Sequence, residues 1–104
     1  MAEPFTNTGR DAAPSIEEEI KEPKKFRVVM HNDDYTTMDF VVRVLMAVFK
    51  KSLEQATRLM LQIHKQGKAV CGVYTEEVAE TKVSAVESMA RNEGFPLKCS
   101  MEEV

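Results

Sequence analysis

The segment from Met38 to Lys50 constrains the fold of this chain more than any other. Thr36 and Thr37 can cap a helix that begins there, and Asp39 favours the positive end of its dipole. The helix is apolar around almost its whole circumference, with Phe40, Val41, Val42, Val44, Leu45, Met46, Val48 and Phe49. A helix of this kind is largely buried, so other elements of the chain must cover it.

Two further helices are expected after this one. Ser52 and Gln55 fit a capping box that opens the second helix, and Gly67 ends it as a left-handed C-cap. Thr75 begins the third helix and Gly94 ends it. At helical spacing, the core stripe of the second helix is Leu53, Ala56, Leu59 or Met60, and Ile63, and the inner face of the third is Ala79, Val83, Val86, Met89 and Ala90.

Three β-branched or aromatic stretches read as strands, at residues 26–31, 68–74 and about 96–102. The element order is therefore strand, helix, helix, strand, helix, strand. A three-stranded antiparallel sheet with the three helices packed on one face is the simplest way to bury these apolar faces. We expect an α+β fold in a single small domain over residues 26–104. Residues 1–25 contain several prolines and few large apolar residues, which predicts a disordered N-terminal extension.

Charge and composition exclude several classes of protein. The formal net charge is −3 and the pI is about 5.4, which argues against nucleic acid as a partner. No apolar run approaches the roughly 20 residues that span a bilayer, and residues 1–4 begin no secretory signal. We therefore expect a cytoplasmic protein that does not enter a membrane. Cys71 and Cys99 form no CxxC pair and are expected to be reduced, buried thiols.

Asn32, Asp33 and Asp34 place three polar acceptors where the first strand ends and the first helix approaches. An ordinary Asx turn is one interpretation. Two adjacent carboxylates without a basic neighbour also favour a cation, either a metal ion or an ammonium group. His64 lies one helical turn after Met60 and could add a third acceptor, although a half-buried surface histidine is the plainer interpretation.

A metal ion is the weaker of the two cation hypotheses. Three consecutive residues are too compact for a calcium loop, whose ligands spread over about 12 positions. His31, His64, Cys71 and Cys99 match no familiar zinc spacing. No serine or cysteine stands beside a marked base, so we expect no enzymatic activity, no metal and no cofactor.

The methionines on the first two helices allow two interpretations. Met38, Met46 and Met60 could line an adaptable apolar pocket, because methionine is flexible and polarizable. Methionine more often simply fills a core. The sequence pattern alone leaves both possibilities open.

Several motifs resemble the ClpS family, the bacterial adaptors of the Clp protease. The stretches 32–36 and 38–41 are similar to the opening motif of that family. Further similar stretches are residues 56–60, 64–69 and 77–82, and the resemblance runs from Phe26 to the C-terminus with matching spacing.

This resemblance implies a non-enzymatic, monomeric adaptor that recognises N-degrons, which are chains that start with Leu, Phe, Tyr or Trp. ClpS-like proteins hand these chains to the hexameric ATPase ClpA, which unfolds them into the ClpP peptidase. By the resemblance, the α-amino group is held by Asn32, Asp33, Asp34 and His64, with Asp34 favoured for the direct contact. The pocket for the first side chain is formed by Thr36, Met38, Val41, Met60, Ile63 and Leu97, and Glu77 and Lys82 contact the N-terminal domain of the ATPase. Met38 is the gatekeeper that disfavours Ile and Val.

One departure from the family concerns Thr37, where these proteins usually have proline. Proline pre-sets φ at the start of a helix, so we expect a looser gate in this chain. An alternative function is an interaction domain that modulates an AAA+ ATPase through its third helix and has no degron pocket. The two hypotheses differ in whether Met38, Val41, Met60 and Leu97 line an open cavity or a filled core.

Overall fold

The computed structural model describes residues 23–104. The element order is strand, helix, helix, strand, helix, strand, as the sequence predicts. The elements are β1 (Lys25–His31), α2 (Met38–Phe49), α3 (Leu53–Gln66), β2 (Lys68–Thr75), α4 (Glu76–Glu93) and β3 (Lys98–Glu103). The predicted N-terminal extension lies outside the described residues except at its end, where Lys25 already belongs to β1.

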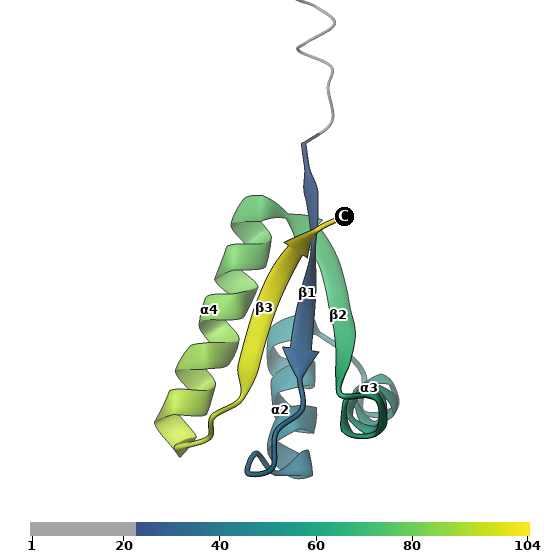
Figure 1. Ribbon diagram of the computed structural model, residues 1–104, viewed down its shortest axis with the longest axis vertical. Helices are drawn as coiled ribbons and strands as arrows, with labels where there is room; N and C mark the ends of the chain where they lie inside the picture. The colour runs from purple at the N-terminus through teal and green to yellow at the C-terminus, as the bar shows by residue number, and fades with distance from the viewer. Residues whose placement is uncertain (1–22) are drawn as a thin grey trace, which may run out of the picture.

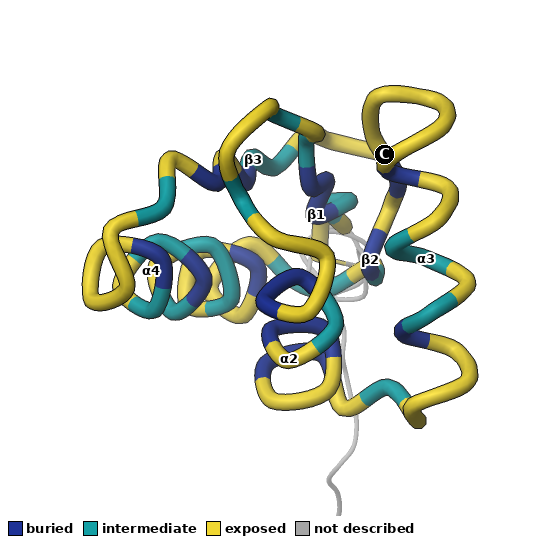
Figure 2. Tube along the Cα trace, turned by 90° about the horizontal axis from the view of Figure 1, so that it is seen from below, coloured by how far each residue is buried: buried dark blue, intermediate teal, exposed yellow. Residues whose placement is uncertain are grey.

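The three strands form one antiparallel sheet in the order β2-β1-β3, so β1 is the central strand (Figure 1). In β1, Val28 and Met30 are fully buried, and Met30 lies opposite Ala69 of β2 and Cys99 of β3. The helices α2 and α4 lie on this same side of the sheet, whereas α3 runs beside the edge strand β2 (Figure 2). The expected α+β fold with one three-stranded antiparallel sheet is therefore confirmed, but α3 packs at the edge of the sheet and not on the face that α2 and α4 cover.

The helix ends follow the chemistry that the sequence predicts. The Thr37 hydroxyl accepts a hydrogen bond from the Phe40 N–H at 3.2 Å and caps α2. Ser52 and Gln55 form the expected reciprocal capping box at the start of α3. Gly67 ends α3 with φ near +92°, a left-handed conformation that glycine adopts without a Cβ penalty.

Three expectations about the helices and strands need correction. The first helix stops at Phe49 because Lys50 takes a left-handed conformation with φ of 58°. This helix is buried on one side only, and Met38 and Met46 are 45% and 39% exposed. The last strand begins at Lys98 rather than near Pro96, since proline has no N–H to donate to the sheet.

Leu53 does not belong to the core, contrary to the predicted stripe of the second helix. Its side chain is 62% exposed, whereas Ala56 and Ile63 are buried. Leu53 is the first residue of α3, and the helix reaches the core only from Ala56 onward. Leu59 and Met60 pack against the core from partly buried positions.

The two cysteines are free and buried, as expected. Burial raises the pKa of each thiol to about 12, so the reactive thiolate is disfavoured at neutral pH. Among residues 23–104, no helix is both long enough and apolar enough to cross a membrane.

Candidate functional site

The loop of residues 32–37 joins β1 to α2 at the lower end of the molecule in Figure 1. The Asp33 carboxylate organises this loop. One oxygen accepts hydrogen bonds from the Tyr35 N–H at 2.8 Å and the Thr36 N–H at 2.7 Å. The other oxygen accepts a hydrogen bond from the Thr36 hydroxyl at 2.7 Å. The Asx-type turn that the sequence allowed is therefore present and is made by Asp33.

These hydrogen bonds also set the ionisation of Asp33. Partial burial by itself would raise the pKa of this carboxyl. The bonds from Thr36 and Tyr35 stabilise the charged form and outweigh burial, so the pKa of Asp33 is lowered. Asp33 is therefore a carboxylate at neutral pH, with both oxygens engaged in the turn.

Asp34 differs from Asp33 in its surroundings. It is exposed, and no donor in the described part of the chain bonds to its carboxylate. Its oxygens remain available to a ligand. Of the two adjacent carboxylates, one shapes the loop and the other faces outward with unused acceptors.

A backbone hydrogen bond brings the end of α3, which carries His64, next to the loop of residues 32–37. The Asn32 N–H donates to the Gly67 carbonyl at 2.8 Å, which ties the end of β1 to the end of α3. His64 lies three residues before Gly67, in the last turn of α3, and its side chain is exposed. Met60 precedes His64 by one helical turn and is half-buried.

These residues surround a cavity of about 410 Å³ between the loop, α2 and α3. Its polar lining comes from the loop and from the end of α3, and its apolar lining comes from the facing sides of the two helices. The lining residues are Asn32, Asp33, Asp34, Tyr35, Thr36, Thr37, Met38, Val41, Met60, Ile63 and His64. The arrangement suits a ligand that has a cationic group with several N–H donors and an apolar part beside it.

Most of the residues proposed from the sequence for amine and side-chain binding line this cavity. Leu97 is not one of the residues that line it; this side chain is 5% exposed and packs in the core. Tyr35 lines the cavity and was not among the proposed residues. It is 76% exposed, and its place inside the motif of residues 32–36 is the signal that could have identified it.

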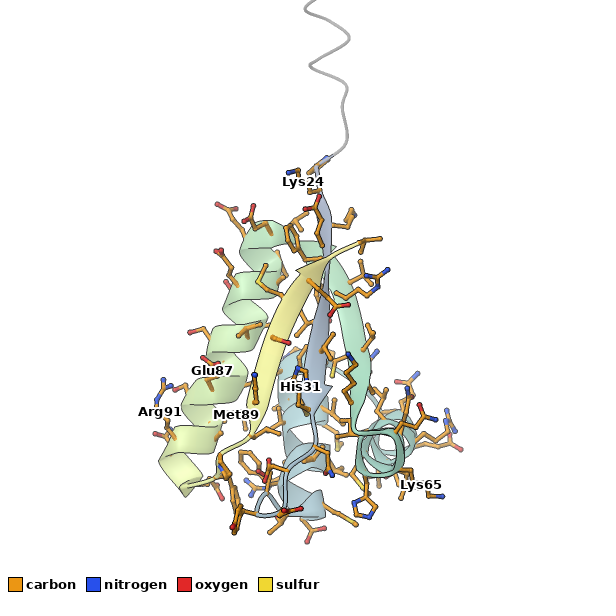
Figure 3. The ribbon with its side chains drawn as sticks, in the orientation of Figure 1. Lys24, His31, Lys65, Glu87, Met89 and Arg91 are labelled. Carbon is orange, nitrogen blue, oxygen red and sulfur yellow. The ribbon has the colours of Figure 1, made fainter. Side chains whose placement is uncertain are left out.

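His31 adjoins this loop but points elsewhere. It projects from the sheet face that carries no helix, near the lower end of β1 (Figure 3). Its Nε2 forms a 2.7 Å hydrogen bond with the Ser100 hydroxyl. Burial and the neighbouring ammonium groups of Lys98 and Lys68 lower the pKa of His31, and Glu102 opposes them. Within residues 23–104, no three His, Cys, Asp or Glu side chains gather in a way that could hold a metal ion.

The two residues proposed to contact an ATPase lie on α4, in a shallow groove of about 870 Å³. Glu77 is exposed in the first turn of the helix. Lys82 is half-buried, and its ammonium group donates to the Val48 carbonyl at 2.7 Å. The same group lies 5.5 Å from the centre of the Tyr74 ring. Lys82 therefore also joins α4 to the C-terminal end of α2, where carbonyls favour a cation.

Comparison with known proteins identifies the family. A family model described as "ATP-dependent Clp protease adaptor protein ClpS" matches residues 21–100. The chain is 61% identical over 104 residues to the "ATP-dependent Clp protease adapter protein ClpS" of Oleidesulfovibrio alaskensis, which covers the whole of both chains. It is 57% identical over 96 residues to the protein of the same name from Nitratidesulfovibrio vulgaris, covering 92% of this chain and 96% of the relative.

A solved structure agrees with these relatives. The fold superposes on Agrobacterium tumefaciens ClpS2 bound to L-phenylalaninamide with a TM-score of 0.78 and 38% sequence identity. The match covers 80% of this chain and all of that one. The relatives are named as adaptors of a protease and not as enzymes. The chain therefore belongs to the ClpS family, the adaptor proteins of the ATP-dependent Clp protease.

Proposed function

We propose that this adaptor binds the free N-terminus of proteins that begin with Leu, Phe, Tyr or Trp and delivers them to the Clp unfoldase and protease. The observation that carries this proposal is the open cavity between α2 and α3, which has an apolar wall and a rim of acceptors. An interaction domain without a degron pocket would have no use for such a cavity. Met38, Val41 and Met60 line open space in this chain, and this favours the degron-binding function.

The rim suits an α-ammonium group. This group offers three N–H donors, and the side chains of Asn32, Asp34 and His64 offer an amide oxygen, a carboxylate and an imidazole nitrogen. A single carboxylate among the three acceptors balances the single positive charge. Asp33 contributes indirectly, because its bonds to Tyr35 and Thr36 hold the loop in shape.

The apolar wall suits the side chain of the first residue. Met38, Val41, Met60 and Ile63 supply it, and burying a Leu or Phe side chain contributes about 1.5–3 kcal/mol. Each charge-assisted hydrogen bond adds about 1.5–3 kcal/mol. After the loss of translational and rotational freedom, a total near −8 kcal/mol, or roughly micromolar affinity, is expected. An adaptor that must release its cargo requires no tighter binding.

The ligand in the related structure supports this assignment. L-phenylalaninamide, to which A. tumefaciens ClpS2 is bound, is a single amino acid with a free α-amino group and a large apolar side chain. It therefore contains the two features that the cavity accommodates. The carboxamide of this ligand corresponds to the peptide bond that would join the first residue of a protein chain to the second.

Delivery requires a second surface. We assign this role to α4, where Glu77 and Lys82 line the groove proposed to contact the N-terminal domain of the hexameric ATPase ClpA. The adaptor acts in this proposal as a cytoplasmic monomer, and one molecule carries both surfaces.

The decisive experiment compares two peptides that differ only at the N-terminus. Fluorescence polarisation with a Phe-starting peptide should give roughly micromolar affinity, as derived above. The same peptide with an acetylated N-terminus lacks the charge and two of the donors, so its binding should be undetectable. A peptide with an internal Phe serves as a second control. Equal affinity for the free and acetylated peptides would refute the proposal.

A further inference from the structure

A second apolar groove runs along the outer side of the α2–α3 pair. It has a volume of about 580 Å³ and is lined by Asp39, Val42, Arg43, Met46, Leu53, Thr57 and Met60. Met46 and Leu53 are among the exposed large apolar side chains of the described residues, at 39% and 62%. The fold of this chain leaves these two side chains uncovered, and neither belongs to the hydrophobic core.

The polar groups along this groove are mostly engaged within the protein. The Arg43 guanidinium forms two 3.2 Å hydrogen bonds to the Glu93 carboxylate, and it lies 5.2 Å from the centre of the Phe40 ring. The Thr57 hydroxyl donates to the Leu53 carbonyl at 2.8 Å. Apart from the exposed Asp39 carboxylate in the first turn of α2, the surface left for a ligand is apolar, and it consists of Val42, Met46, Leu53 and Met60.

The groove adjoins the proposed degron pocket, because Met60 lines both. Met38 stands at the pocket and Met46 at the far part of the groove, and both lie on α2. Met46 lies eight positions after Met38, which corresponds to about 12 Å along the helix axis at 1.5 Å per residue. An extended polypeptide advances about 3.3 Å per residue and covers this distance in three or four residues.

We propose that this groove, formed by Val42, Met46, Leu53 and Met60, is a second subsite for the bound substrate chain and takes a large apolar side chain at its third to fifth position. The inference rests on the proposed function, since the first residue must occupy the pocket for the chain to follow this course. It adds a preference beyond the first residue. Proteins with an exposed Leu, Phe or Met soon after the N-terminal residue are then the favoured cargo.

The size of the groove favours this occupant over a second copy of the chain. A stable dimer buries about 800 Å² on each partner, with some 20–30 residues a side. The groove presents four apolar side chains, which is enough to contact one or two side chains of a ligand. That matches a short peptide segment.

The test uses two peptides that both begin with Phe. One continues with glycines only, and the other has Leu at position 4, with a fluorophore at the C-terminus of each. Partial burial of one Leu is worth about 1 kcal/mol, so the second peptide should bind about fivefold more tightly to the natural chain. In the double variant M46S/L53S the fivefold gain should vanish, while the affinity for the glycine peptide stays unchanged.

A matched control is available on α3, the helix that carries Leu53. Leu61 is 40% exposed and lines neither cavity, so L61S should keep the gain. Because Met46 and Leu53 are exposed, neither substitution should prevent folding, and L53S alone should lose part of the gain.

The outcomes separate the two proposals. If the glycine peptide binds but Leu at position 4 gives no gain, the subsite is refuted and the degron pocket stands. A gain that persists in M46S/L53S also refutes it. If the glycine peptide fails to bind, the proposed function fails and the subsite with it. A dimer seen by sedimentation velocity and abolished by M46S/L53S would assign the groove to a second copy of the chain, which overturns the inference.

Discussion

At the scale of single residues, the two adjacent aspartates have different surroundings. Asp33 accepts three hydrogen bonds from its own loop, whereas Asp34 is exposed and accepts none from the described residues. The motif shows two equivalent carboxylates, and only the folded loop distinguishes them. Substitutions at the two positions should therefore have different effects.

D34A should weaken binding of a Phe-starting peptide by about 10–100-fold, because one charge-assisted hydrogen bond of about 1.5–3 kcal/mol is lost. Its free energy of unfolding should stay within about 0.5 kcal/mol of the natural chain. D34N keeps an acceptor but loses the charge, and we expect intermediate affinity. D33A should lower the free energy of unfolding by about 1–2 kcal/mol, since it removes the bonds that hold the turn. The measurements are fluorescence polarisation and urea denaturation. A D34A variant that binds as tightly as the natural chain would move the amine contact to another residue.

Thr37 offers a second test at this scale. Its φ of −74° suits proline, which the family usually has at this position. T37P removes the capping bond to the Phe40 N–H but also restricts the unfolded chain, so the free energy of unfolding should change by less than about 1 kcal/mol. If Met38 is the gate that we propose, the ratio of affinities for Leu-first over Ile-first peptides should rise, because the backbone next to Met38 becomes more rigid. An unchanged ratio would show that residue 37 does not set the strictness of the gate.

The third prediction at residue scale concerns pH and the stability of the sheet. The pKa of His31 is lowered below its ordinary 6.5 by burial and by Lys98 and Lys68. The unfolded chain therefore binds more protons than the folded one as the pH falls below about 6.5, and stability must fall with it. Urea denaturation between about pH 7.5 and 5 should show this loss, and H31Q should show a smaller one. Equal slopes for both proteins would contradict the assignment to His31.

At the scale of helices and strands, the sequence predicted the order and type of all six elements and most of their ends. Local chemistry decides these features, such as the capping box of α3 and the left-handed Gly67. The sequence did not predict which apolar residues would stay exposed. Leu53 has core spacing, but it lies in the first turn of α3, before the helix reaches the core. Whether an apolar side chain stays exposed depends on where the helices pack against one another. The apolar periodicity of a single helix does not show this.

The cavity shows the same limit. Residues 32–36 and His64 could be grouped through motifs, and all of them line one cavity. Leu97 packs in the core and is not among the residues that line the cavity, because its position depends on how the segment between α4 and β3 enters the core. Tyr35 was overlooked although it lies inside that motif, because an aromatic side chain more often packs in a core, whereas this one is 76% exposed.

The helix α4 is the element proposed to contact the ATPase, and its two residues make different predictions. E77A removes an exposed side chain, so it should weaken binding to the isolated ClpA N-terminal domain without changing the melting temperature. K82A should weaken binding and also lower the melting temperature, because it breaks the bond to the Val48 carbonyl. Isothermal titration calorimetry measures the affinity for the ClpA domain, and thermal denaturation measures the melting temperature. E87A, on the same helix but outside the groove (Figure 3), is the control and should leave binding intact. Full binding by E77A would place the contact on another surface.

At the scale of the whole molecule, the two proposed surfaces lie at opposite ends. The cavity lies at the end where β1 leads into the loop, and the first turn of α4 lies at the other end (Figure 1). The seven residues of β1 span the distance between them, which is about 20 Å. Pro23 and Lys24 lie at the α4 end, where they share a small cavity with Glu76 and Glu77. Pro23, the first described residue, therefore lies beside the proposed ATPase surface and far from the proposed degron pocket.

This separation predicts that deleting residues 1–22 uncouples the two activities. The truncated chain keeps β1 and the whole cavity, so its affinity for a Phe-starting peptide should stay within twofold of the full chain, about 0.4 kcal/mol. Delivery should fail, because the residues that precede Pro23 at the proposed ATPase surface are then missing when the ATPase engages the adaptor. The measurement is degradation of a Leu-starting fluorescent protein by ClpA, ClpP and ATP. A chain in which residues 1–22 are replaced by a Gly/Ser linker of equal length separates a need for length from a need for sequence. Normal degradation with the truncated chain would refute a role for this segment in delivery, and a loss of peptide binding would show that it also contributes to the pocket.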